Sequence, residues 1–277
     1  MTHRGKGYRI GQIVLHLALL FVAIATLTPL IWLVAATLKG EKLFTYLFFP
    51  PLDELTLISY IHLFEQIHFL RFLLNSTFVT GASVMVQLFF ASMGGFALAK
   101  YEFKGKRTLI LVMLTTLMIP GQVLLGPLYE LMYAIGFIDT FWGLIVPGAV
   151  SVFGIFLFRQ SMLHIPDELL QAGRVDGCSE FRLYWNIVVP ISRPMIGAFC
   201  LMSFMGSWNS FLWPQIIIHT RDLYTLPIAL NQMVGLYSHD YGPLMAGTLL
   251  SILPVIFLFL LLQKEFISGL TAGAVKG

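Results

Sequence analysis

Charge is scarce in this sequence. Only 11% of its 277 residues are Asp, Glu, Lys or Arg, whereas 57% are hydrophobic. Soluble domains carry about 25% charged residues. The shortage argues against an ordinary soluble domain and, with a mean hydropathy of +0.82, indicates an integral membrane protein. The sequence also lacks the alternating ten-residue segments that are typical of a membrane barrel, so we expect helical spans. A net charge of +3 gives no reason to expect a nucleic-acid partner.

Motifs for catalysis, metals and phosphate binding are also missing. The only cysteines, Cys178 and Cys200, have no metal-binding spacing, and we expect no disulfide between them. Gly105-Lys106 is followed by Arg107 and lacks the upstream glycine of a phosphate-binding loop. We therefore expect no catalytic residue, no metal site and no bound cofactor in this chain.

Six stretches are long and apolar enough to be membrane helices, which need about 20 residues. They predict an all-α, polytopic membrane protein with one domain over residues 1–277. The predicted spans are 11–38, 72–98, 108–133, 141–158, 194–218 and 243–262. A helical pattern over 56–71 predicts an amphipathic helix, either at the outer membrane interface or capping the bundle.

The middles of these spans contain no Asp, Glu, Lys or Arg, and His16 is the only titratable exception. A charge in mid-bilayer costs at least ~2.5–3.5 kcal/mol, so such charges are kept for function. Ion-coupled transporters and voltage sensors usually need them. If this protein moves a solute uphill, the energy must come from another subunit.

Basic residues are unevenly distributed among the loops. Thirteen of the 17 Lys and Arg residues fall in the two termini, in the loop after the second span and in a central loop at 159–193. Positively charged loops stay in the cytoplasm. We therefore expect both termini and the central loop to be cytoplasmic.

The central loop is the most polar segment in the second half of the chain. Its sequence predicts a helix, a turn and a second helix. Pro166 suits a first helical position, and Asp167 and Glu168 favour the first turn. Gly177 suits a left-handed C-terminal cap, and Ser179 can cap the second helix. Pro190 and Pro194 are predicted to end the second helix. The loop either docks onto another protein or only covers the floor of the bundle.

One pattern in this loop resembles the EAA motif of the membrane subunits of ABC importers. Gln171-Ala172-Gly173 is followed three residues later by Gly177 and then by Pro190. Other similar stretches are YEFKGKR from Tyr101, WNSFLWP from Trp208 and GLTAGAVKG from Gly269, so the resemblance covers nearly the whole chain. It is strongest to the maltose-type, carbohydrate-uptake branch. Gln171 stands where the motif has an acid, and Gly173 where it has a second alanine.

The resemblance implies a function and a set of partners. The chain would be the permease subunit of an ATP-driven importer in a bacterial plasma membrane, moving a sugar or oligosaccharide by alternating access. Its partners would be a second permease, two cytoplasmic ATPases that bind ATP and magnesium, an external solute-binding protein, and lipid. The ATPase-coupling residues would be Asp167, Glu168, Gln171, Ala172, Gly173, Asp176 and Gly177. The tail from Gly269 would run beside the ATPases.

Polar and aromatic residues in the spans are candidates for the solute path, because sugars are held by hydrogen bonds and aromatic faces. Polar residues in spans also join helices to one another, which is the competing interpretation. The candidates are Gln87, Gln122, Ser207, Trp208, Asn209 and Trp213. Alternative functions are a permease for glycerol phosphate, a polyol or another small solute and, with less support, an ion-coupled transporter or channel.

Overall fold

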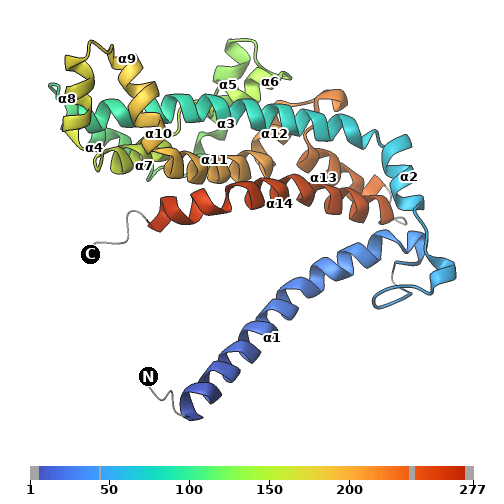
Figure 1. Ribbon diagram of the computed structural model, residues 1–277. Coiled ribbons are helices and arrows are strands. Elements are labelled where there is room, and N and C mark those ends of the chain that lie inside the picture. The colour runs from blue at the N-terminus through green and yellow to red at the C-terminus, as the bar shows by residue number, and fades with distance from the viewer. Residues whose placement is uncertain (1–5, 44, 237–240, 272–277) are drawn as a thin grey trace. The chain divides into compact units, whose positions relative to one another are not determined.

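A computed structural model describes residues 6–43, 45–236 and 241–271 of the chain, which are helical or irregular without any strand (Figure 1). The all-α prediction is therefore confirmed for this described part. The chain divides into two compact units. One comprises Met1–Phe69 with Leu230–Ile252, and the other Leu70–Ala229 with Leu253–Gly277. A single domain over 1–277 stays a prediction, as does the placement of the tail after residue 271, which lies outside the described residues.

The first unit begins with the long helix α1 (Lys6–Thr37), followed by the short helices η1 (Gly40–Lys42), η2 (Leu52–Glu54) and α2 (Ile58–Glu65). Lys39 lies between α1 and η1. Its side chain is buried, and its Nζ donates to the carbonyl of Tyr46 at 2.6 Å. The predicted helix at 56–71 is shorter than expected, because His68 adopts a left-handed φ of 60° and α3 starts directly after it. Ser59, on the predicted polar face of α2, is buried, while Ile61 and Phe64 are exposed.

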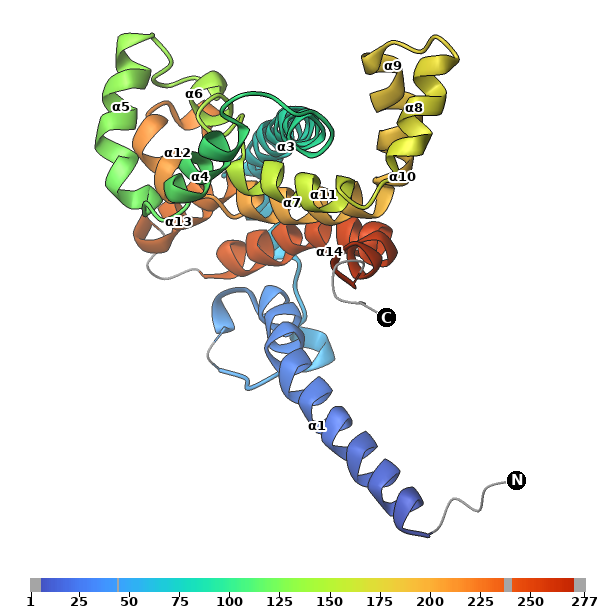
Figure 2. The same ribbon diagram turned by 90° about the vertical axis from the view of Figure 1, so that its left-hand side faces the viewer.

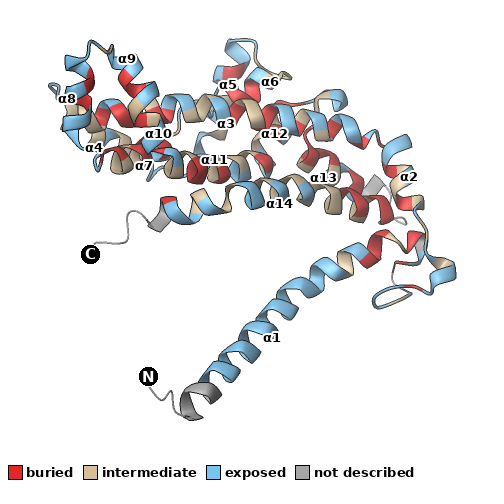
Figure 3. Ribbon diagram, in the orientation of Figure 1, coloured by how far each residue is buried: buried red, intermediate tan, exposed pale blue. Residues whose placement is uncertain are grey.

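Three helices in the described part are long and apolar enough to cross a membrane: Gly11–Thr37 within α1, α3 (Phe69–Lys100), and Gly242–Gly269 within α14 (Gly242–Thr271). They match the first, second and last of the predicted spans. Most of α1 is exposed, as Figure 3 shows, while α3 and α14 are partly buried and each exposes apolar side chains such as Leu74 and Phe257. Exposed apolar surface of this length is expected when lipid or another membrane subunit covers it.

The other three predicted spans are wrong as continuous helices. The span 108–133 breaks into α4 (Lys106–Thr116), η3 (Gly121–Leu124) and α5 (Leu125–Ala134), with a bend of 91°. The extended backbone of Pro120, which also lacks an N–H donor, interrupts it. The span 141–158 breaks into α6 (Phe141–Ile145) and α7 (Val152–Met162) around Pro147-Gly148.

The span 194–218 breaks into α11 (Arg193–Trp208) and α12 (Leu212–Ile217). After η5 (Arg221–Leu223), α13 (Leu226–Leu236) follows. The six-span count therefore stays a prediction, since two bent helix pairs in the described part of the chain could serve as additional spans, for a total of up to five. Each break leaves backbone groups without helical partners, which a membrane protein tolerates only where protein or a cavity surrounds them.

The second unit has two apolar cores. One joins the end of α3 to α7 and the segment 165–188 around the fully buried Phe158 and Leu183. The other joins the start of α3 to α5, α6, α12 and the start of α13 around Ile217. Gly154 lets α7 approach α11, because a Cβ there would lie 2.5 Å from Cε2 of Phe199. Figure 2 looks nearly along α3 and shows α8, α9 and α10 grouped together beside it.

Candidate functional site

The central polar segment folds as a helical hairpin, which we define as residues 165–191. It contains α8 (Asp167–Val175), α9 (Glu180–Leu183), the π-helical turn η4 (Tyr184–Val188) and α10 (Val189–Ile191). Of the predicted loop 159–193, residues up to Met162 instead belong to α7.

The turn between α8 and α9 is as predicted, and the two ends of the hairpin differ from the prediction. Gly177 has a φ of +80°, and the Ser179 side chain accepts a hydrogen bond from the backbone of Arg182. Pro166 precedes α8 as its N-cap residue and is not its first helical residue. Pro190 does not end the second helix, which continues to Ile191 and bends by 81° before α11. The π-helical turn just before Pro190 changes the local hydrogen-bond register, so the missing N–H is accommodated.

Gly173 holds the two helices of the hairpin together. It is buried, and a Cβ at this position would lie 2.4 Å from Cδ2 of Leu183 on α9. Gly173, one of the predicted coupling residues, therefore faces the interior of the hairpin, and its role in coupling stays a prediction. Close packing inside the hairpin explains why glycine stands here.

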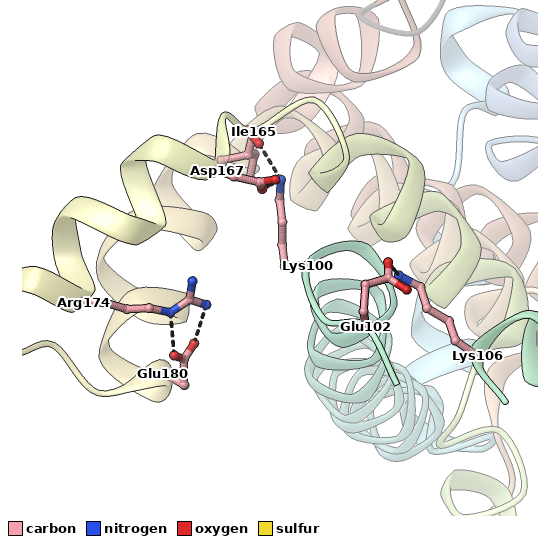
Figure 4. Close-up of polar contacts among 7 residues, drawn as sticks. All are labelled: Lys100, Glu102, Lys106, Ile165, Asp167, Arg174 and Glu180. Carbon is pink, nitrogen blue, oxygen red and sulfur yellow. Dashed lines mark hydrogen bonds and ion pairs between the residues drawn. The ribbon is translucent and has the colours of Figure 1, made fainter. Parts of the chain in front are cut away.

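The hairpin is attached to the end of α3 by Lys100 (Figure 4). Lys100 Nζ lies 2.6 Å from Oδ1 of Asp167 and also donates to the carbonyl of Ile165. Only 5% of the Lys100 side chain is exposed, against 70% for Asp167. The hydrogen bond from Lys100 lowers the pKa of Asp167 below its ordinary value. A single nearly buried ammonium group thus fixes the start of α8.

A second ionic contact closes the hairpin on itself. Arg174 on α8 donates from Nε and Nη2 to the two carboxylate oxygens of Glu180, at 2.8 and 3.1 Å (Figure 4). The hydroxyl of Tyr101, the residue after α3, also donates to Glu180. These hydrogen bonds, that from Arg174 first, lower the pKa of Glu180. Burial, followed by the contact with Glu180, raises the pKa of Tyr101.

The outer face of α8 remains available to a partner. Glu168, Gln171, Ala172 and Val175 recur at helical spacing and are exposed, Val175 to 87%. Asp176 and Gly177 are exposed at the end of the helix. Of the seven predicted coupling residues, six are therefore accessible and Gly173 is not. Their role in coupling stays a prediction.

A cavity of about 420 Å³ lies in the second unit between α3, α11 and the two helix breaks at 146–151 and 209–211. None of the described residues that line it is charged. Its polar lining consists of Ser76, Thr80, Ser83, Gln87, Ser151, Ser203, Ser207, Ser210, Trp213 and Thr225. The irregular backbone at these two helix breaks thus borders the cavity, where water or a ligand can form hydrogen bonds with it.

Hydrogen bonds fix several of these side chains. Ser203 donates to Oε1 of Gln87 at 2.7 Å and joins α11 to α3. Trp213 Nε1 donates to the carbonyl of Gly143 at 2.9 Å, which holds the indole in place. The backbone N–H of Leu226 donates to Ser76 at 2.7 Å. These hydrogen bonds hold polar side chains of the cavity wall in place.

The predicted solute-path residues are only partly brought together. Gln87, Ser207 and Trp213 line the cavity. Trp208 is buried and stacks on Phe204 with ring centroids 5.3 Å apart. Asn209 donates to the carbonyl of Met205 at 2.9 Å, and Gln122 is exposed in η3. The last three residues do not line the cavity.

Most of the hydroxyl groups of the cavity, all but Ser207, were not predicted from the sequence. Ser76, Thr80 and Ser83 precede the predicted Gln87 at intervals of four, three and four residues, which places all four on one face of α3. That spacing is a signal that could have identified them. Single Ser and Thr residues are common in membrane helices, so each of them alone is a weaker signal than a larger polar group.

Comparisons with known proteins agree with one another. The family described as "Binding-protein-dependent transport system inner membrane component" matches residues 89–269. The "Arabinooligosaccharides transport system permease protein AraQ" of Bacillus subtilis (strain 168) is 35% identical, covering 100% of both chains. The "Lactose transport system permease protein LacG" of Rhizobium radiobacter is 30% identical, covering 97% of both.

A solved structure is similar in fold. It is described as "Crystal structure of a bacterial ABC transporter involved in the import of the acidic polysaccharide alginate". The match has a TM-score of 0.84 at 21% identity and covers 96% of this chain and 100% of that one.

Proposed function

The chain belongs to the binding-protein-dependent transport system inner membrane components, and from this premise we propose that it moves a neutral oligosaccharide across a bacterial plasma membrane. As a permease subunit it forms part of an ABC importer, whose ATPases supply the energy for alternating access. The chain itself hydrolyses no ATP, and ATP and magnesium bind to those partner subunits.

The cavity is the observation that supports a neutral sugar as the solute. It is hollow, lined by hydroxyl and amide groups with an ordered indole, and uncharged along its described lining. Neutral sugars bind through hydrogen bonds and aromatic faces, whereas an anion such as glycerol phosphate calls for basic groups. The names of the relatives AraQ and LacG support the same class.

The hairpin is the proposed route by which energy from ATP hydrolysis reaches the membrane helices. The exposed outer face of α8 carries Glu168, Gln171, Ala172 and Val175. Three other charged residues of the hairpin are paired with one another or with α3: Asp167, Arg174 and Glu180. Such a rigid hairpin can transmit a push from an ATPase to the helices. The proposed assembly contains a second permease, two ATPases and an external solute-binding protein. Both termini and the hairpin then face the cytoplasm.

Reconstitution tests the solute class. The chain is assembled with its partner permease, ATPases and solute-binding protein in proteoliposomes, and uptake and ATP hydrolysis are measured with arabinotriose, lactose and glycerol 3-phosphate. We expect uptake of a neutral sugar together with stimulation of ATP hydrolysis. Stimulation by glycerol 3-phosphate alone would contradict the proposal.

Crosslinking tests the coupling surface. After Cys178 and Cys200, both free thiols, are replaced by serine, Val175→Cys is expected to crosslink to an ATPase subunit. Leu52→Cys is a matched control, because Leu52 is also 87% exposed but lies in the other unit. Equal crosslinking of both cysteines, or none at position 175 in an assembled transporter, would count against the hairpin as the coupling surface.

A further inference from the structure

Polar side chains of the cavity form two opposed rows. The row on α3 consists of Ser76, Thr80, Ser83 and the amide Gln87, and the other row consists of Ser203 and Ser207 on α11 and Ser210 just after it. The two rows face each other, since Ser203 contacts Gln87 and Ser207 Oγ lies 3.5 Å from Thr80 Oγ1. A row of small polar residues can serve only to pack two helices together, so it does not by itself identify a ligand.

Thr225 supplies an independent observation. It lies between η5 and α13, lines the cavity and is only 5% exposed. Its Oγ1 is buried and has no hydrogen-bond partner among the described residues. The neighbouring groups are already paired, since the Thr225 carbonyl accepts from Ala229 and the next N–H donates to Ser76.

A buried hydroxyl without a partner is unfavourable for folding, and a valine of the same shape would avoid this cost. Water in the cavity can satisfy the hydroxyl while the site is empty, since about 420 Å³ is room for several molecules. A solute that enters must replace those hydrogen bonds. A sugar hydroxyl can do so as both donor and acceptor, whereas an apolar solute cannot.

We propose that this chain binds the solute directly, with the hydroxyl of Thr225 hydrogen-bonded to a hydroxyl of a neutral sugar unit seated between the two rows. The proposal rests on the function proposed above and extends it, because the solute contact is assigned to this subunit and not only to its partner permease. Thr225 thereby contributes to affinity for the solute and takes no part in energy coupling.

The test compares three variants in the complete reconstituted transporter, with arabinotriose and lactose as probes. Thr225→Val keeps the shape and removes the hydroxyl, Thr225→Ser keeps the hydroxyl, and Ser59→Ala removes another buried unpartnered hydroxyl, in the other unit. For the transported sugar we expect Thr225→Val to raise the KM of uptake about three- to tenfold, the loss of one hydrogen bond. Thr225→Ser and Ser59→Ala should keep the wild-type KM.

Thermal unfolding of the solute-free transporter distinguishes a role of Thr225 in solute binding from a role in packing. Because Thr225→Val removes an unsatisfied hydroxyl, the unfolding temperature should be equal to or above that of the wild type while KM rises. An unchanged KM in Thr225→Val, an equal rise in Ser59→Ala, or a lower unfolding temperature in Thr225→Val would overturn the inference. Neutral sugar uptake with an unchanged KM contradicts this inference alone, whereas uptake of glycerol 3-phosphate alone contradicts the proposed function as well.

Discussion

The hairpin and the cavity use polar groups in opposite ways. The hairpin carries full charges, and each ion pair keeps one partner at least partly exposed to water, as with Lys100 and Asp167. The described lining of the cavity has hydroxyl and amide groups without a charge. Charges in fixed pairs hold a shape, which suits a part that transmits force. Neutral hydroxyls bind weakly and release easily, which suits a part through which a solute passes.

Overpacking the hairpin should give the largest effect. We expect Gly173→Leu to push α8 away from Leu183, because even a Cβ would lie 2.4 Å from its Cδ2. Overpacking costs about 1–3 kcal/mol, so uptake should fall roughly tenfold or more. The matched control is Gly126→Leu on α5, where a Cβ meets nothing within 4 Å. Sugar binding by the detergent-solubilised transporter should persist in both variants, and its loss in Gly173→Leu would show that the two regions are not separate.

Removing the Lys100 ammonium should have the next largest effect. Lys100→Met leaves Asp167 and the Ile165 carbonyl without their donor. We expect the number of ATP molecules hydrolysed per sugar imported to rise about two- to fivefold, in the range of a partly exposed ion pair. Lys100→Arg should recover part of the coupling. Lys104→Met, at an exposed position in the loop that follows α3, is the control, and an equal loss of coupling there would contradict a specific role of Lys100.

Acid should weaken the hairpin and leave the cavity unchanged. The contacts with Arg174 and Tyr101 hold the pKa of Glu180 below its ordinary value of 4.5. Stabilisation by this carboxylate is therefore complete above the ordinary pKa and is lost as the pH falls through the lowered one. The difference in unfolding temperature between wild type and Arg174→Gln should be constant near neutral pH and shrink below about pH 4.5.

The cavity provides the contrast in the same pH experiment. Because none of its described lining residues titrates in this range, the KM for a neutral sugar should be flat between about pH 5 and 8. Two results would contradict the separation of the two regions. One is a difference in unfolding temperature that increases at low pH, and the other is a KM that changes over the pH range in which Glu180 titrates.

Introducing the acidic residue of the motif at position 171 should have the smallest effect on coupling. Gln171 is exposed on α8, so Gln171→Glu adds a charge in contact with water. An exposed ion pair contributes little, and we expect coupling to change by less than about twofold. Coupling is again measured as ATP hydrolysed per sugar imported. A larger change would show that the partner surface buries this position.

The sequence alone was sufficient to predict the features that depend on residues close together in the chain. The turn at Gly177, the cap at Ser179 and the three long apolar helices follow from local conformation and apolar length. It was not sufficient for the broken spans, because apolar composition continues through Pro120 and Pro147 although the helix does not. The inward position of Gly173 and the unpartnered hydroxyl of Thr225 depend on residues distant in the chain, Leu183 among them, which no local pattern reports.

We propose that energy enters through the hairpin while the solute is held in the cavity. The most direct test measures uptake and ATP hydrolysis in the same proteoliposomes, over a range of sugar concentrations, for Lys100→Met and Thr225→Val. We expect Lys100→Met to raise the ATP used per sugar and keep the KM, and Thr225→Val to raise the KM and keep the ATP used per sugar. If each variant changed both quantities together, this division of roles would be contradicted.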